Sequence, residues 1–155
     1  MGIKSFQGRR AAPEKIQSAP IMVSDYMTTD LITFREDQSV VEVMQTLVDN
    51  KISGGPVVNE YGELQGIISD ADCMKQISEG RYFNMPVGDI KVRDYMSREV
   101  STITTDINIF DCASLFYKHG CRRFPVLEDG KLVGQISRKD ILCAALEMRA
   151  HNWHV

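Results

Sequence analysis

The chain contains two copies of one sequence unit, offset by 69 residues. Asp25-Tyr26-Met27 in the first copy corresponds to Asp94-Tyr95-Met96 in the second. After a gap of one residue, both copies carry the pattern Gly-x-Leu-x-Gly-x-Ile-Ser-x-x-Asp, which ends at Asp72 and at Asp140. A repeated unit of about 50 residues predicts a pseudo-symmetric body in which each copy offers one candidate ligand site.

Length and composition limit the classes of protein to consider. The 155 residues suffice for one compact domain or two small lobes that share a core. Residues 1–20 are polar and are interrupted by Gly8, Pro13 and Pro20, so we expect a flexible N-terminal tail. They lack the apolar core of a signal peptide, and no apolar run approaches the roughly 20 residues that span a bilayer. We therefore expect a cytoplasmic protein without a membrane partner.

The charge is divided unequally between the copies. The net charge of −3 argues against a dedicated nucleic-acid binder, although four basic residues in the N-terminal segment leave that alternative open. Residues 23–79 contain eleven acids and three bases, whereas residues 92–141 contain seven acids and eight bases. An anionic ligand would therefore meet a more favourable field in the second copy.

Each copy predicts the element order β-α-β-β-α. Asp37 and Asp106 are expected to cap the first helix, and Gly120 to end it in the second copy. Apolar residues then follow with the spacing of one buried helical stripe. They are Val40, Val43, Met44, Leu47 and Val48 in the first copy, and Ile109, Cys112, Ala113, Phe116 and Tyr117 in the second. Glycine-containing turns predict two hairpins, and the second helices are expected to begin near Asp70 and Arg138, the former stopping at Gly80.

These elements predict an α+β fold in which two β-α-β-β-α repeats pack sheet to sheet with pseudo-two-fold symmetry, because neither copy can bury a full core alone. The expected boundaries are a tail at 1–20, a first repeat at 21–80, a linker at 81–91, a second repeat at 92–149 and a C-terminal tail at 150–155. The unpaired apolar helix surface predicts a homodimer.

The sequence contains no catalytic constellation. Cys112, His119 and Cys121 do not have the spacing of a common zinc site, and no CxxC pair occurs. No phosphate-binding loop of the Walker type is present. We therefore expect neither an enzyme, nor a metal site, nor a catalytic cofactor.

The repeated motifs resemble tandem CBS domains, the pair called a Bateman module. The shared features are the Asp-Tyr-Met opening, the Pro-Val strand after the first helix, the acidic-glycine hairpin and the Gly-x-x-Ser-x-x-Asp closure, and they cover roughly residues 23–145. The resemblance implies two clefts that bind adenosine-type ligands, with the closure serine and aspartate contacting phosphate and ribose. A carboxylate suits a ribose diol, and helix N-terminal amides suit phosphate. The alternative is that both pairs only cap helices.

The resemblance assigns ligand contacts in each copy. In the second they are Thr102, Thr104, Arg122, Arg123, Phe124, Pro125, Ser137, Arg138 and Asp140. In the first, weaker set they are Thr33, Gly54, Gly55, Pro56, Ser69 and Asp72. Arginines precede the proline in the second copy and can bind phosphate, whereas glycines precede it in the first and let backbone or a bulkier neutral group approach. Because alternate strand residues face opposite ways, we favour Arg123 over Arg122 as the phosphate contact.

The resulting hypothesis is a non-catalytic sensor of AMP, ADP or ATP. It signals to an effector protein that the sequence does not identify. Whether magnesium binds together with the nucleotide is left open by the sequence. The alternatives are an interaction protein with vestigial clefts, and a binder of another adenosyl ligand such as S-adenosylmethionine or NAD.

Overall fold

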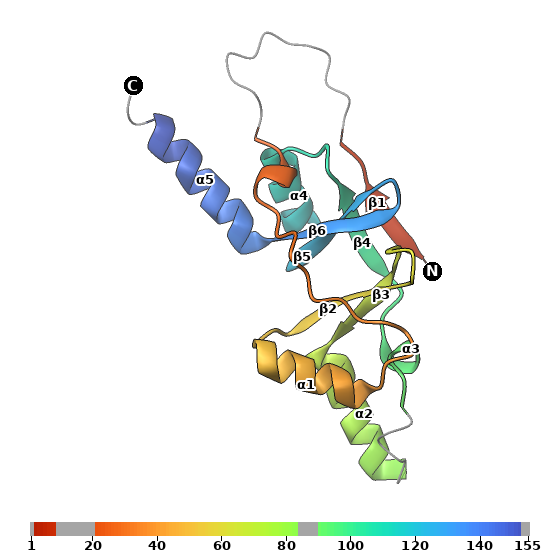
Figure 1. Cartoon of the computed structure of the whole chain (residues 1–155). Helices are drawn as coiled ribbons and strands as arrows, with labels where there is room; N and C mark the ends of the chain where they lie inside the picture. The colour runs from red at the N-terminus through yellow and green to blue at the C-terminus, as the bar shows by residue number, and fades with distance from the viewer. Residues whose placement is uncertain (1, 9–20, 84–89, 153–155) are drawn as a thin grey trace. The chain divides into compact units, whose positions relative to one another are not determined.

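The computed structural model describes residues 2–8, 21–83 and 90–152, and it divides into two compact units (Figure 1). Unit 1 comprises Met1–Lys4 and Leu31–Val100, and unit 2 comprises Ser5–Asp30 and Ser101–Val155. Within the described part of the chain, no helix is both long and apolar enough to cross a membrane. The units differ from the sequence copies. The opening segment of the first copy, residues 23–30, belongs to unit 2, and the opening segment of the second copy, residues 92–100, belongs to unit 1.

Unit 1 contains a hairpin with helices α1 and α2 packed together beside it (Figure 1). Its elements are α1 (Val40–Asn50), β2 (Gly54–Val58), β3 (Leu64–Ser69), α2 (Asp70–Phe83) and the short α3 (Val92–Tyr95). β2 and β3 are antiparallel, and Phe34 adds a parallel bridge to Val57 on the other side of β2. The core consists of the inward residues of these elements, with Phe34, Val40, Val43, Val57 and Ile68 almost completely buried.

Unit 2 repeats this plan and adds one strand. Its elements are η1 (Val23–Asp25), β4 (Val100–Thr104), α4 (Ile109–His119), β5 (Arg123–Glu128), β6 (Lys131–Ser137) and α5 (Arg138–Asn152). The additional strand is β1 (Ile3–Phe6), of which Ser5 and Phe6 belong to unit 2, and the sheet order is β1-β4-β5-β6. β4 is parallel to β5, β6 is antiparallel to β5, and α4 packs against α5.

The opening segment of each copy completes the sheet of the other copy. Thr28 and Gln135 exchange two backbone hydrogen bonds, of 2.8 and 2.9 Å, at the edge of β6. Ser97 and Ile67 make the corresponding pair, of 2.8 and 2.9 Å, at the edge of β3. These pairs of bonds satisfy strand edges that would otherwise remain open. The opening segment of each copy therefore makes the same contact with the other copy.

The Met of each opening motif explains why a glycine is repeated at the same place in the opposite copy. A Cβ placed on Gly134 would lie 2.7 Å from Met27 Sδ, and one placed on Gly66 would lie 2.7 Å from Met96 Cε. Both glycines are buried. The missing side chain at each glycine thus makes room for the swapped segment.

The helix ends differ in part from the sequence predictions. The N-caps are Ser39 and Asn108, whose side chains accept hydrogen bonds from the amides of Glu42 and Asp111. The prediction of Asp37 and Asp106 is therefore wrong, because the helices begin two residues later and an equally suitable cap residue lies there. Gly120 is confirmed as a left-handed C-cap, with φ of 66°.

The buried stripes are narrower than predicted. Val40, Val43 and Leu47 are buried on α1, and Ile109, Cys112 and Phe116 are buried at the corresponding positions on α4. Val48 and Tyr117, however, are 73% and 94% exposed. An 11-residue helix against one hairpin buries three positions, so the last position of each stripe faces outward.

Two boundaries also differ. α2 continues past Gly80 to Phe83, and β1 lies within the region predicted as a flexible tail. Residues 3–6 are ordered because they pair with β4 and because the Phe6 ring packs against His119 and Phe124. The remaining tail residues 9–20, most of the linker and Trp153 lie outside the described residues.

Candidate functional site

The closure motif forms the same hydrogen-bonded unit in both copies. Ser69 precedes the first residue of α2, and its amide and Oγ lie 2.8 and 3.1 Å from Asp72 Oδ2. Ser137 and Asp140 reproduce these bonds at 2.8 and 3.0 Å at the start of α5. The Asp amide also donates to the Ser Oγ in each copy. This is a capping box, so the alternative structural role of the motif is realised in both copies.

The capping box leaves part of the carboxylate for other contacts. All the side-chain bonds that hold Asp140 to Ser137 use Oδ2, so Oδ1 lies outside the box. The box also fixes the carboxylate on the backbone of its own helix turn, which lowers the entropy cost of presenting it to a ligand. Capping and ligand binding can therefore coexist at this residue.

Strand register places Arg123 beside the capping box of Ser137 and Asp140. In the β5–β6 ladder Arg123 lies directly opposite Ser137, so their side chains project from the same face of the sheet. Arg122 lies outside the strand and is exposed, and its carbonyl accepts the amide of Arg138 at 3.3 Å. The Nε of Arg138 donates to the carbonyl of Cys121 at 2.7 Å. Five candidate residues therefore gather where β5 and α5 begin: Arg122, Arg123, Ser137, Arg138 and Asp140. We call this group the Ser137 cluster.

The other candidates of the second copy have different surroundings. Thr104 pairs with Leu127, four residues along β5 from Arg123, which corresponds to about 13 Å of strand. Its hydroxyl hydrogen-bonds Asp106 and lies near the Phe6 carbonyl. Phe124 is fully buried, with its ring 4.6 Å from that of Phe116. Thr102 and Pro125 are also buried.

In unit 1, the described residues at the corresponding positions are not cations. Gly54 occupies the register position of Arg123, opposite Ser69. A Cβ on Gly54 would lie 2.7 Å from the Ile68 carbonyl oxygen, and one on Gly55 would lie 2.9 Å from the Phe34 ring. The space next to both glycines is therefore filled by the chain itself rather than kept for a neutral ligand group.

The remaining first-copy candidates have simple surroundings. Pro56 is buried within β2, whereas Thr33 is exposed next to the buried Phe34. Sequence alignment places Asp70 opposite Arg138, and Asp70 Oδ1 accepts the amide of Ala71 at 2.8 Å. In unit 1 the Asp70 carboxylate thus accepts the hydrogen bond of a first-turn amide that could otherwise donate to a bound anion.

The first-turn amides differ between the units as a result. In unit 1 the amides of Asp70, Ala71 and Asp72 donate to Ser53 O, Asp70 Oδ1 and Ser69 Oγ. In unit 2 the amide of Lys139 has no acceptor among the described residues. An anion at the start of α5 would therefore find one available amide together with basic side chains.

The net charges of the two units differ less than the net charges of the two sequence copies, because the opening segments are exchanged. Counted by unit, the sequence places 8 basic and 12 acidic residues in unit 1, and 10 basic and 9 acidic residues in unit 2. The difference between the units is five charges, compared with nine between the copies. Local side chains at the Ser137 cluster therefore matter more than the overall field.

The cysteines are placed as core or surface residues. Cys112 is fully buried in unit 2, and burial raises the pKa of its thiol to about 12. Burial likewise raises the pKa of the Cys73 thiol. Among the described residues, no three His, Cys, Asp or Glu side chains are grouped to hold a metal ion.

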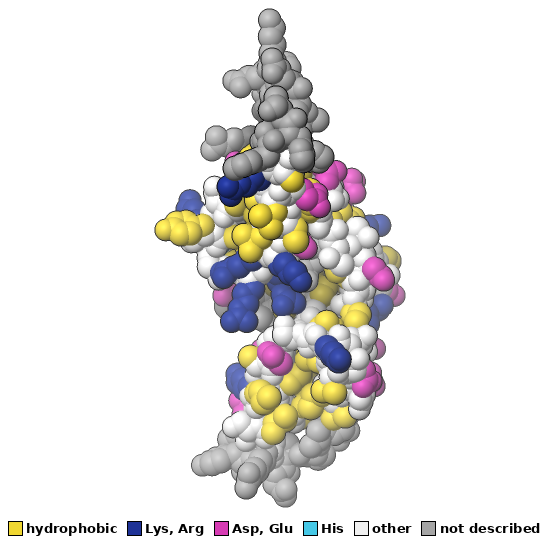
Figure 2. Space-filling view, turned by 90° about the vertical axis from the view of Figure 1, so that its left-hand side faces the viewer, with side chains coloured by type: hydrophobic (Ala, Val, Ile, Leu, Met, Phe, Trp, Pro, Cys, Tyr) yellow, Lys and Arg dark blue, Asp and Glu magenta, His cyan; other side chains and the backbone are white. Residues whose placement is uncertain are grey.

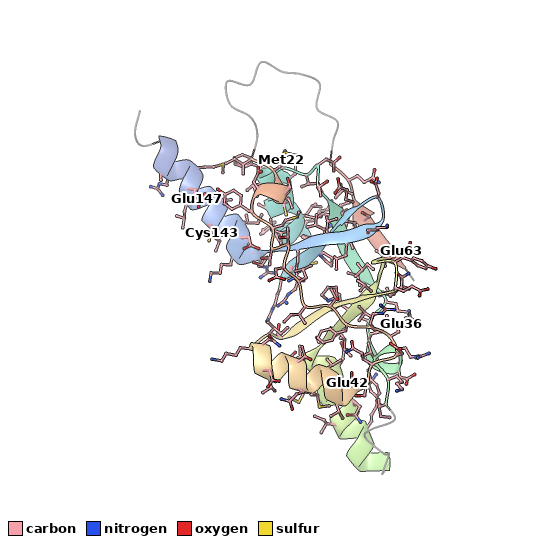
Figure 3. The ribbon with its side chains drawn as sticks, viewed as in Figure 1. Met22, Glu36, Glu42, Glu63, Cys143 and Glu147 are labelled. Atoms are coloured by element: carbon pink, nitrogen blue, oxygen red, sulfur yellow. The ribbon has the colours of Figure 1, made fainter. Side chains whose placement is uncertain are left out.

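A pair of tyrosine–glutamate contacts was not predicted from the sequence. The Tyr26 hydroxyl donates to Glu147 on α5, which Figure 3 labels one turn after Cys143. The Tyr95 hydroxyl donates to Glu79 on α2 at 2.6 Å. The hydrogen bond to Glu79 raises the pKa of Tyr95, and the bond to Glu147 raises that of Tyr26. Because the glutamates occupy the same position of each copy, the repeat alignment contained a signal for this interaction.

Sequence comparison assigns the family. The CBS domain model matches residues 23–79 and 92–147, so the chain belongs to the CBS domain family as a tandem CBS pair. The chain is 31% identical to protein MJ1426 of Methanocaldococcus jannaschii over 81% of its own length and 92% of that protein. It also covers 16% of the A-adding tRNA nucleotidyltransferase of Aquifex aeolicus at 30% identity, so longer relatives include an enzyme.

Solved structures share the α+β CBS-pair fold. CBSX2 of Arabidopsis thaliana, determined in complex with AMP, matches with a TM-score of 0.72 and 30% identity over 83% of this chain and 98% of CBSX2. The CBS domain pair of protein MJ0100, in complex with 5′-methylthioadenosine and S-adenosyl-L-methionine, matches with a TM-score of 0.68 and 25% identity. That match covers 84% of this chain and 99% of the MJ0100 pair. Homologous pairs therefore bind AMP or S-adenosylmethionine.

Proposed function

We propose that the chain is a non-catalytic sensor of adenine nucleotides that binds AMP, ADP or ATP at the Ser137 cluster and signals to a partner protein. The observation that carries the proposal is the register of β5 and β6, which puts Arg123 across from Ser137 on one sheet face. Guanidinium groups bind phosphate through charge-assisted bonds. The AMP complex of CBSX2 supports an anionic adenosine ligand for this fold.

We assign separate roles to the residues of the cluster. Asp140 is held by Ser137 through Oδ2, and its Oδ1 accepts from a ribose diol. The phosphate lies at the start of α5, where the Lys139 amide and Arg123 supply donors. A ligand that binds one conformation better than another then shifts the population that the partner recognises.

Replacement of Asp140 by Ala tests ribose recognition. We expect AMP affinity to fall by about 10- to 100-fold, because a charge-assisted bond is worth roughly 1.5–3 kcal/mol. The variant also loses its capping box, so Asp72→Ala is the matched control that loses the same box in unit 1. Calorimetric titration with AMP and urea unfolding should show similar losses of stability but a loss of affinity only in Asp140→Ala.

Equal AMP affinities in these two variants would contradict the assignment of Asp140. Absence of saturable heat with AMP, ADP and ATP in the unmodified protein would favour the interaction protein with vestigial clefts. S-adenosylmethionine belongs in the same titration series, because unit 1 lacks cations at its closure motif and MJ0100 was solved with that ligand. Titrations with and without magnesium decide whether the metal accompanies the nucleotide.

We propose in addition that the protein is a homodimer formed through its helices. Hydrophobic side chains are exposed on each unit in Figure 2, and Phe110, Tyr117, Leu142 and Leu146 of unit 2 are between 64% and 94% exposed. Between α4 and α5 lies an apolar groove of about 410 Å³ that includes Phe116 and Ile141. Monomeric proteins rarely expose large apolar patches.

Light scattering checks the dimer. At micromolar concentration we expect a mass of about 35 kDa, twice the 17.5 kDa of the chain. Leu142→Glu should shift the mass toward that of the monomer, whereas Lys131→Glu in the hairpin, away from the helices, should not. A monomer mass for the unmodified protein would contradict the proposal.

A further inference from the structure

We propose that the surface beside β4 that holds residues 3–8 is an acceptor site for an extended peptide, and that its partner is the same segment of a second copy of the chain. We call residues 3–8 the arm. In the structure the arm occupies this site within its own chain, as strand β1 beside β4 (Figure 1). The site is separate from the Ser137 cluster, so the proposal does not depend on nucleotide binding.

One aromatic side chain anchors the arm. The Phe6 ring centroid lies 4.7 Å from that of His119 at the end of α4. It lies 6.4 Å from the Phe124 ring, with the planes at 77°, an edge-to-face arrangement. The arm therefore inserts an aromatic residue between a helix end and the sheet core, which is how strand-addition sites gain specificity beyond main-chain pairing.

The second residue after the strand must be a glycine. The Gly8 amide lies 3.1 Å from Asp106 Oδ1, and a Cβ on Gly8 would lie 2.3 Å from the Asp106 carbonyl oxygen. A side chain at this position is therefore excluded while the backbone contact is kept. The site consequently selects a strand with an aromatic residue two positions before a glycine.

The described residues of unit 1 form no counterpart of this site. Alignment of the copies places Asn50 at the position of His119 and Gly55 at that of Phe124. The space beside Gly55 is occupied by the Phe34 ring of unit 1 itself. The aromatic pocket for the arm is thus a property of the second copy, and it is not required by the repeated fold.

The arm fills its site incompletely. Ile3 is 38% exposed, and only Phe6 and Gly8 of the arm are half-buried. Grooves of about 430 Å³ and 550 Å³ lie on either side of the arm, next to α4 and next to the β5–β6 hairpin. A segment with few buried contacts opens at low free energy.

A second copy supplies a strand that fits by construction. Its arm has the same sequence, and exchange of identical elements between protomers requires no new contact. Twelve residues separate Gly8 from Ile21, a length that reaches at most roughly 40 Å. The arm can therefore reach beyond its own unit without displacing the rest of the fold.

Peptide binding tests the acceptor site. A fluorescein-labelled peptide of residues 2–8 is titrated with a variant that lacks these residues, and anisotropy is measured. We expect saturable binding that falls at least about tenfold for peptides carrying Phe6→Ala or Gly8→Ala. Ser5→Ala is the matched control, because Ser5 is exposed and should leave binding unchanged. Equal binding of all four peptides, or no binding while circular dichroism shows a native fold, would overturn the acceptor site.

Photo-crosslinking tests the partner. A chain with benzoylphenylalanine in place of Phe6 is mixed with ¹⁵N-labelled unmodified chain and irradiated. Mass spectrometry then shows whether the unlabelled arm is joined to labelled segments containing His119 or Phe124. We expect such mixed products, and their share should rise with protein concentration. Products formed only within one chain would overturn the exchange, whatever the oligomeric state formed by the helices.

Discussion

Units 1 and 2 have the same backbone plan but differ in the residues that occupy equivalent positions. Gly54 and Arg123 both face a capping serine across a hairpin, and Asp70 and Arg138 both begin the following helix. The shared hydrogen bonds, such as those of Thr28 and Ser97, hold the sheets together in both units. The comparison teaches that contacts shared by both units specify the fold, whereas the residues that differ at equivalent positions give the two closure motifs different surroundings.

Alanine at the two paired glycines should produce the largest difference. A Cβ on Gly66 would lie 2.3 Å from the Ser97 carbonyl oxygen, a backbone atom, whereas one on Gly134 first meets the flexible Met27 side chain at 2.7 Å. We expect Gly66→Ala to lower the free energy of unfolding by about 3 kcal/mol and Gly134→Ala by about 1 kcal/mol. Urea unfolding followed by circular dichroism measures both. Equal losses would mean that the two swapped segments are held with the same rigidity.

Arg123→Ala should weaken the binding of a ligand that carries a phosphate more than the binding of one that does not. We expect AMP affinity to fall about tenfold or more and adenosine affinity to stay within about twofold, because only AMP carries the phosphate. Arg122→Ala is the control, with a smaller effect expected because Arg122 lies outside the strand. Gly54→Ala is not a suitable ligand test, since its Cβ collides with the Ile68 carbonyl. If Arg123→Ala weakens AMP and adenosine equally, this arginine does not bind phosphate.

Substitution of Gln76 should have the smallest effect on the free energy of unfolding, and it should raise this free energy rather than lower it. Its side chain is only 1% exposed, and neither Oε1 nor Nε2 has a hydrogen-bond partner among the described residues, whereas the aligned residue in unit 2 is the buried Ala144. Gln76→Leu has a similar volume and should raise the free energy of unfolding by about 1 kcal/mol. Ala144→Gln should lower it, because it buries an amide at a position that is fully buried. A lower melting temperature for Gln76→Leu would show that the amide has a stabilising partner.

The sequence was sufficient for the family, the repeated elements and the hairpins. The Gly62 and Gly130 turns join the expected hairpins, each glycine with a positive φ of 79°, and α2 and α5 begin at the expected residues. Local patterns encode such features because turn and helix-start chemistry depends on neighbouring residues. The roles of Ser69 and Ser137 as caps were also foreseen as one of two alternatives.

Other features could not be predicted because they depend on distant contacts. Residues 3–6 carry no alternating pattern, and they become a strand only because β4 offers an edge and His119 offers a ring surface. The separation of Thr104 from the Ser137 cluster follows from the parallel register of β4 and β5, which no local pattern specifies. The exchange of opening segments is likewise invisible in either copy alone.

That exchange has a consequence for the order in which the protein can fold as it is synthesised. Apart from Met1–Lys4, unit 1 is one continuous stretch, so its parts leave the ribosome together. Unit 2 combines Ser5–Asp30 with Ser101–Val155, and its early segment must wait for the last third of the chain. During that interval Val23, which is fully buried in the finished protein, has no core to enter. The first copy therefore emerges before the sheet that its opening segment completes.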